Sequence, residues 1–226
     1  MDHWLSYAPG DFLMFGPQVY WRLFEMHNVA TWPLPVLAPP LGAVVALTLA
    51  TGRQRAPQCA FAAAALACLG AAHFLLARYA PINWIAGWAA WAFGLQALAL
   101  VGLAAFHRTG AAPARADTAA AVGWAFLAGA ILFYPLSGVV IGRVLAPAEI
   151  AGLAPDPTAL ACLGLACVLL RGWPRVALSV IPLAWCAASA ATLLTLGEAQ
   201  GWGLAAAAIL WGASRPWRDS AKPADL

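Results

Sequence analysis

Side chains able to bind a metal ion or move a proton lie near the start of the chain. Glu25, His27 and Asn28 are close neighbours, and His73 falls in a later apolar segment. Imidazole beside carboxylate is suited to either task. Because each segment has one histidine and no ligand-spacing motif, His73 could equally bond a neighbouring helix. We therefore predict no metal centre and no cofactor.

Gln96 is the deepest strongly polar side chain, in the middle of another apolar segment. Gln96 could form a hydrogen bond between helices, or it could line a pathway for a solute. The apolar segments lack the residues that the usual intramembrane catalytic sites require. The only lysine is Lys222, no pair of acids lies within an apolar segment, and Ser137 has no histidine beside it in the sequence. We predict that the protein is not an enzyme.

The composition sets the environment of these side chains. Of 226 residues, 63% are hydrophobic and 9% are charged, whereas soluble domains have about 45–50% apolar and about 25% charged residues. This excludes a secreted domain, a nucleic-acid-binding module and a disordered regulator. We predict an integral membrane protein whose main partner is the lipid bilayer.

Seven apolar segments are long enough to be helices, and isolated segments in lipid must be helical because their backbone groups need internal partners. They are Thr31–Thr51, Pro57–Tyr79, Ile82–Phe106, Thr118–Gly142, Pro157–Leu170, Pro174–Leu196 and Gly201–Ser214. The fifth and seventh are only about 21 Å long as helices, against a hydrocarbon core of about 30 Å. The predicted fold is an all-α bundle of about seven spans.

Basic residues give the orientation. With the N-terminus outside, the inner side holds Arg53, Arg55, Arg108, Arg115, Arg171, Arg175, Arg215, Arg218 and Lys222, and the outer side keeps Arg22, Arg78 and Arg143. This follows the positive-inside rule. We predict an outer segment over residues 1–30, a helical bundle over residues 31–214 and a cytoplasmic tail over residues 215–226.

Prolines shape the entry to the bundle. Residues 17–28 predict an interfacial helix with aromatic residues on more than one side, which would cover protein as well as lipid. Pro33 and Pro35 follow it, and Pro39 and Pro40 fall inside the first apolar segment. Proline removes a backbone donor, so we expect that segment to be kinked or partly unwound.

Several motifs resemble those of an uncharacterised family of bacterial polytopic inner-membrane proteins that carry a domain of unknown function. They are Phe15-x-Pro17-x-x-Tyr20-x-x-Leu23-Phe24-x-x-x-Asn28-x-x-x-Trp32-Pro33, Ile82-Asn83, Tyr134-Pro135, Pro155-Asp156-Pro157-Thr158 and Ile181-Pro182-Leu183-x-Trp185. The chain departs from the pattern at Gly16, where the resemblance implies serine, and at His27, where it implies an aromatic residue. The resemblance implies a multi-pass protein of the bacterial inner membrane and brings no activity.

The topology places residues from separate regions on the outer side. We expect a cleft there, with candidate residues Tyr20, Glu25, His27, Asn28, Trp32, His73, Asn83, Asp156 and Thr158. Asp156 and Thr158 could instead be ordinary helix-start residues.

Two functional classes stay open. The first is a small-solute or ion permease, favoured by the prolines of the first segment and the two short segments. The second is an accessory or assembly subunit that docks another membrane protein. Gly138-x-x-x-Gly142 would allow close helix contact, within the chain or with a second copy.

Overall fold

In the computed structural model, the described part of the chain comprises residues 13, 15–106, 118–140, 142 and 144–214, and all its extended regular structure is helical. The predicted all-α class is confirmed. The elements are α1 (Pro17–Ala30), α2 (Leu34–Ala50), α3 (Ala56–Phe74), η3 (Leu75–Tyr79), α4 (Ile85–Phe106), α5 (Thr118–Ala128), η4 (Gly129–Phe133), α6 (Tyr134–Val140), α7 (Pro155–Leu169), α8 (Gly172–Thr195) and α9 (Gln200–Ala213). The predicted tail, and most of residues 1–14, lie outside the described residues.

Each predicted apolar segment coincides with a helix or a run of helices. Four runs are long and apolar enough to cross a membrane: Ala56–Tyr79, Ile85–Phe106, Thr118–Val140 and Gly172–Thr195. The α1–α2 pair adds a fifth if it counts as one span, although the two helices are bent by 86° at their junction. Length and composition therefore support four to five candidate spans.

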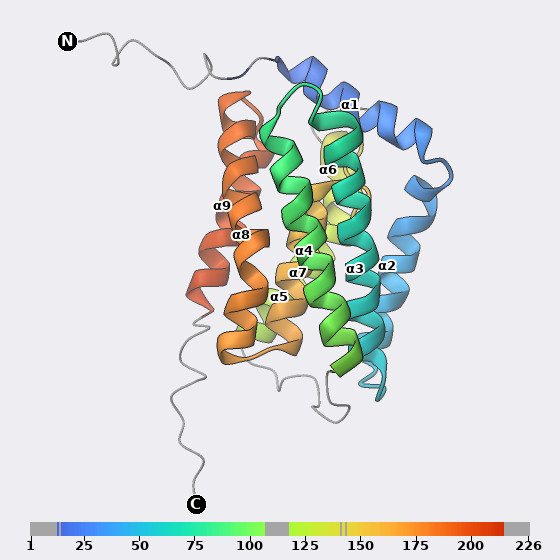
Figure 1. Cartoon of the computed structure of the whole chain (residues 1–226), viewed down its shortest axis with the longest axis vertical. Helices are drawn as coiled ribbons and strands as arrows, with labels where there is room; N and C mark the ends of the chain where they lie inside the picture. The colour runs from blue at the N-terminus through green and yellow to red at the C-terminus, as the bar shows by residue number, and fades with distance from the viewer. Residues whose placement is uncertain (1–12, 14, 107–117, 141, 143, 215–226) are drawn as a thin grey trace, which may run out of the picture.

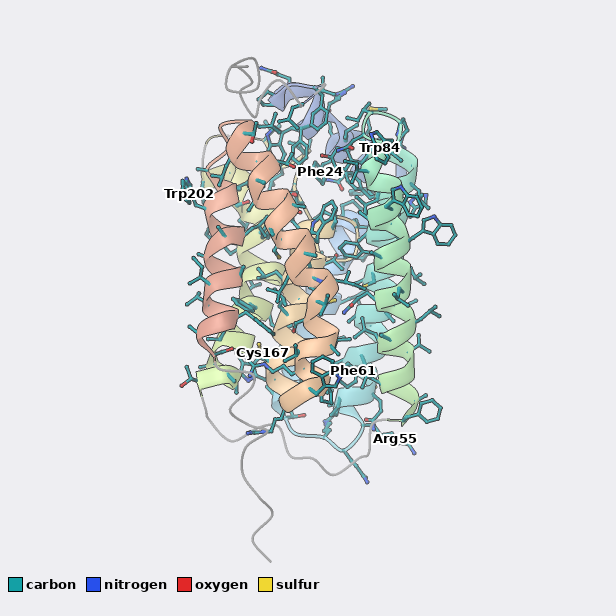
Figure 2. All side chains as sticks on the ribbon, turned by 60° about the vertical axis from the view of Figure 1, so that its left-hand side comes forward. Phe24, Arg55, Phe61, Trp84, Cys167 and Trp202 are labelled. Atoms are coloured by element: carbon teal, nitrogen blue, oxygen red, sulfur yellow. The ribbon has the colours of Figure 1, made fainter. Side chains whose placement is uncertain are left out.

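The helices form a bundle with α1 lying across one end (Figure 1). We call this end the α1 end. The opposite end, which carries the turn at Arg53 and Arg55 and the junction at Arg171, is called the basic end; Figure 2 shows Phe24 and Arg55 at the two ends. Every acidic residue in the described part of the chain lies at or near the α1 end: Glu25, Glu149, Asp156 and Glu198.

Helix α7 lies at the centre of the bundle, against α3, α5, α8 and α9. It has only 15 residues, and nearly all of them are buried. A helix that is surrounded by protein does not have to match the thickness of a bilayer's hydrocarbon core, because its ends and sides contact other helices and not lipid. The central position explains how such a short apolar segment fits beside α3 and α8, which have 19 and 24 residues.

Small residues allow the helices around α7 to approach closely. A Cβ atom on Gly123 of α5 would lie 2.7 Å from the carbonyl oxygen of Gly164 on α7. A Cβ atom on Gly70 of α3 would lie 1.9 Å from the carbonyl oxygen of Gly152, which itself has a φ of +91°. Both contacts require glycine, because any side chain would displace the opposing backbone.

The expected unwinding of the first apolar segment is wrong. Helix α2 is continuous from Leu34 to Ala50, with Pro39 and Pro40 inside it. Pro39 and Pro40 lie beyond the first four residues of the helix, so each removes one backbone hydrogen bond, and the bonds of the residues around them hold the helix together. The change of direction occurs before α2, around the Trp32-Pro33 peptide, which is cis.

Gly138 and Gly142 do not lie within one continuous helix. Helix α6 ends at Val140, and Gly142 follows it with a φ of +82°. This left-handed conformation suits glycine at the end of a helix. The spacing of the two glycines therefore reflects a helix end, and it does not form a packing motif.

Candidate functional site

Helix α1 is a cap that joins separate loops at its end of the bundle. The Trp21 indole donates to a Glu198 carboxylate oxygen at 2.9 Å, between α8 and α9. The Asn28 amide donates to the carbonyl oxygens of Ala146 and Ala148, both at 2.9 Å. The face of α1 with Tyr20, Trp21, Leu23, Phe24 and His27 is buried, so the predicted covering role of this helix is confirmed.

Beneath this cap, Asp156 occupies the centre of a buried polar network. Its side chain is fully buried in the first turn of α7. One carboxylate oxygen accepts from the Trp185 indole at 2.6 Å, and the other from the hydroxyls of Ser189 at 2.7 Å and Tyr134 at 3.2 Å. No basic side chain of the described residues forms an ion pair with it. A buried carboxylate is thus held by neutral donors from α8 and α6.

A cavity of about 170 Å³ adjoins this network. It lies between the α1-end portions of α4 and α8, and Tyr20 closes it from α1. Its lining residues are Tyr20, Tyr79, Asn83, Ile85, Ala86, Ala89, Trp185, Ala188, Ser189 and Thr192. Trp185 and Ser189 line the cavity and also donate to Asp156. We call this cavity, with Asp156 behind it, the outer cavity.

The structure brings together part of the predicted cleft. Tyr20 and Asn83 line the same cavity, and Asp156 lies one hydrogen bond behind its wall. Ring contacts connect Tyr20 to Tyr79 at 6.1 Å and Phe15 to both tyrosines.

Other predicted members of the cleft have different environments. Glu25 pairs with Arg22 of its own helix at 2.6 Å, and Trp32 is exposed at the α1–α2 junction. Thr158 accepts from the Gly152 amide and donates to the Ala154 carbonyl. Thr158 therefore has the helix-start role that the sequence left open, whereas Asp156 points into the bundle.

His27 and His73 do meet, with ring centroids 5.5 Å apart. The His27 ring is buried against Phe74, and neither of its nitrogens has a hydrogen-bond partner. Burial lowers the pKa of His27 to about 4, and His73 and Arg78 add a smaller effect in the same direction. Across the described residues, no group of three or more His, Cys, Asp or Glu side chains is arranged to hold a metal ion.

Gln96 bonds across the bundle, because its amide nitrogen donates to the Leu178 carbonyl of α8 at 3.0 Å. Arg175, predicted on the inner side, is a fully buried residue in the first turn of α8. Its guanidinium donates to Cys167 and Ser214 and lies 6.0 Å from the Trp211 ring centroid. Neither residue lines the outer cavity.

A larger cavity of about 400 Å³ lies between α2, α3, η4 and α7. Its lining is wholly apolar and includes Leu34, Pro39, Leu49, Ile131 and Leu165. Binding sites for small polar molecules need a few convergent polar groups that fix orientation. The outer cavity has such groups and the larger cavity lacks them.

Sequence reasoning missed that Trp185, Ser189, Tyr79 and Tyr134 belong with Asp156. A usable signal was present, since Trp185 and Ser189 are four residues apart and so share one face of a helix. Nothing in the sequence indicates that this face meets the first turn of a helix that starts at Pro155.

The fold and the site define an all-helical bundle with four to five candidate membrane spans and a buried carboxylate under a capping helix. A family model matches residues 17–217, and the chain belongs to this family, DUF6064, a family of unknown function. The expected membership of an uncharacterised family is therefore confirmed. No curated protein and no solved structure matches the chain.

Proposed function

We propose that the chain is a multi-pass protein of the bacterial inner membrane, with seven spans, the N-terminus outside and the C-terminus inside. Support comes from the seven apolar helical segments and from the separation of charge between the two ends of the bundle. In the described part of the chain, Arg53, Arg55 and Arg171 lie at one end, and the acidic residues lie at the other together with Arg22 and Arg78. Basic residues are enriched on the cytoplasmic side of membrane proteins.

The orientation is tested with two reporters fused after Lys222. A fluorescent protein, which folds in the cytoplasm, should be bright, and alkaline phosphatase, which is active outside, should be inactive. The reverse pattern would place the α1 end in the cytoplasm and would contradict the proposed orientation.

We further propose that the protein is a permease for a small solute. The outer cavity is the observation that carries this proposal. It combines aromatic and hydroxyl groups with a buried carboxylate, and it lies where two helices meet under a cap.

The proposal is tested by thermal unfolding of the purified full chain with a panel of small polar solutes. A solute that binds the folded state raises the melting temperature. Ala188→Trp, which fills the outer cavity, should abolish that increase, and Ala187→Trp, at the neighbouring position of α8 that does not line the cavity, should retain it. A stabilising solute should then accumulate in vesicles that contain the protein. Stabilisation that survives Ala188→Trp would contradict the proposal.

An accessory subunit that docks another membrane protein is the second candidate. Helix α4 favours it, because Trp84, Trp88 and Trp91 form an exposed stripe. A Cβ atom added at Gly87 or Gly94 of the same helix would meet nothing within 4 Å. Aromatic residues beside open glycines allow a partner helix to approach closely. Loss of a co-purifying membrane protein on Trp88→Ala would support this candidate.

A further inference from the structure

None of the described residues that line the outer cavity is basic. Its polar groups are the hydroxyls of Tyr20, Tyr79, Ser189 and Thr192 and the amide of Asn83. Behind the wall lies the buried acid Asp156, whose two oxygens each accept a hydrogen bond from a cavity-lining side chain, Trp185 or Ser189. An anion would be repelled by this carboxylate in a poorly solvated site, whereas a cation would be attracted.

Three aromatic side chains line the cavity, and each of them packs against a further ring. Phe15 packs on Tyr20 at 6.4 Å and on Tyr79 at 5.7 Å. Phe93 meets the Trp185 ring edge to face at 5.7 Å. Rings held in this way are prepared to receive a cation without a loss of side-chain entropy on binding.

The kind of cation follows from the rest of the lining. Ca²⁺ and Mg²⁺ take about six or more oxygen ligands at close range, and the cavity walls include Ile85, Ala86, Ala89 and Ala188. Aliphatic and aromatic walls beside a carboxylate fit an alkylated ammonium group. A volume of about 170 Å³ is below the range of drug-sized sites, about 300–1,000 Å³, which favours a molecule of few heavy atoms.

We propose that the outer cavity binds a small organic cation, an amine or a quaternary ammonium group, between Tyr20, Tyr79 and Trp185 and in the field of Asp156. This inference rests on the proposed solute-binding function of the same cavity and specifies its substrate class.

The test compares how fast a cysteine placed in the cavity reacts with a cationic reagent and with an anionic one. In the full chain with Cys59→Ser, which removes the exposed native cysteine, Ala188→Cys introduces a reactive group into the lining. The purified protein is treated in detergent with trimethylammonium-ethyl and with sulfonatoethyl methanethiosulfonate. The ratio of the two rates is divided by the ratio at Ala187→Cys in the same Cys59→Ser protein, an exposed position of α8 that does not line the cavity and serves as a surface reference.

We expect the cationic reagent to be preferred by about tenfold over the surface reference. Tetramethylammonium should slow the cationic reaction, and tert-butanol, a neutral molecule of similar shape, should not. This competition needs no change at Asp156. Asp156→Asn, in folded protein, should remove the preference.

The two proposals fail in distinguishable ways. Equal normalised rates, a preference for the sulfonate, or no protection by tetramethylammonium would overturn the organic-cation class and leave a solute cavity in place. A cysteine at position 188 that reacts with neither reagent would show that the cavity is closed, and the proposed permease function would fail with it.

Discussion

At the scale of single residues, Asp156 controls the chemistry at the α1 end. Its carboxylate receives hydrogen bonds from a phenol, an indole and an alcohol. These donors belong to α6 and α8, so one side chain of α7 links three helices. The network therefore stabilises the bundle and also sets the electric field of the outer cavity.

Removing this acceptor should destabilise the protein. Asp156→Ala leaves the Trp185, Ser189 and Tyr134 donors without a partner, and a buried unsatisfied group costs about 1–3 kcal/mol. We expect a clear fall in melting temperature, with a smaller fall for Asp156→Asn, whose amide oxygen still accepts. Glu25→Ala is the control, because an exposed ion pair contributes about 0–1 kcal/mol. Equal effects of Asp156→Ala and Glu25→Ala would contradict this role.

His27 makes stability depend on pH. Its pKa is about 4 in the folded protein, against an ordinary value of 6.5. Between these values the unfolded chain binds the proton and the folded chain does not, so stability falls as pH is lowered from about 6.5 to about 4. His73 and Arg78 face the same ring and oppose its protonation.

His27→Phe should make this pH dependence shallower, because phenylalanine has no proton to bind and fits beside Phe74. The measurement is the melting temperature of both proteins at intervals across that pH range. A wild-type slope retained by His27→Phe would assign the pH dependence to other groups.

The contacts of single side chains could be predicted from the sequence less well than the helix boundaries or the fold class. Tyr20, Asn83 and Asp156 were correctly expected near one another from the topology alone. The partners of Asp156 were not, because a hydrogen bond between α7 and α8 depends on the rotation of each helix about its axis. Hydrophobic patterning leaves that rotation undefined for helices such as α4 and α7, which are apolar on all sides.

At the scale of elements, α7 and α1 organise the rest. Helix α7 is buried by the helices around it, and α1 bonds the loops at one end. The helix boundaries were largely predictable, since long apolar runs between prolines, glycines and charges define them. The central place of α7 was not, because only the packed structure reveals that a short segment is surrounded by protein.

The close approach of α3 to the turn at Gly152 gives a prediction for one element. Gly70→Ala would place a Cβ atom 1.9 Å from the Gly152 carbonyl oxygen, so the helix and the turn must separate, at a cost of about 1–3 kcal/mol. Gly94→Ala on α4 meets nothing within 4 Å and should be neutral or stabilising, because alanine favours helix by about 1 kcal/mol. The measurement is the melting temperature of both variants. Similar melting temperatures would contradict the close contact between Gly70 and Gly152.

At the scale of the whole molecule, the two ends of the bundle differ in charge and in construction. The basic end has arginines on short turns, and the α1 end has a cap, a buried carboxylate and a cavity. With the α1 end outside, the outer cavity can receive a solute there. A permease must also expose the same site to the other side.

Access to position 188 from each side of the membrane tests this claim most directly. Ala188→Cys, in the Cys59→Ser protein, is treated with the two membrane-impermeant methanethiosulfonate reagents in right-side-out and in inverted vesicles. Trp84→Cys is the control for the α1 end, and native Cys59 is the control for the basic end. The account predicts that position 188 reacts in both preparations while each control reacts in only one. Reaction of position 188 solely in right-side-out vesicles, or in neither preparation, would contradict a permease.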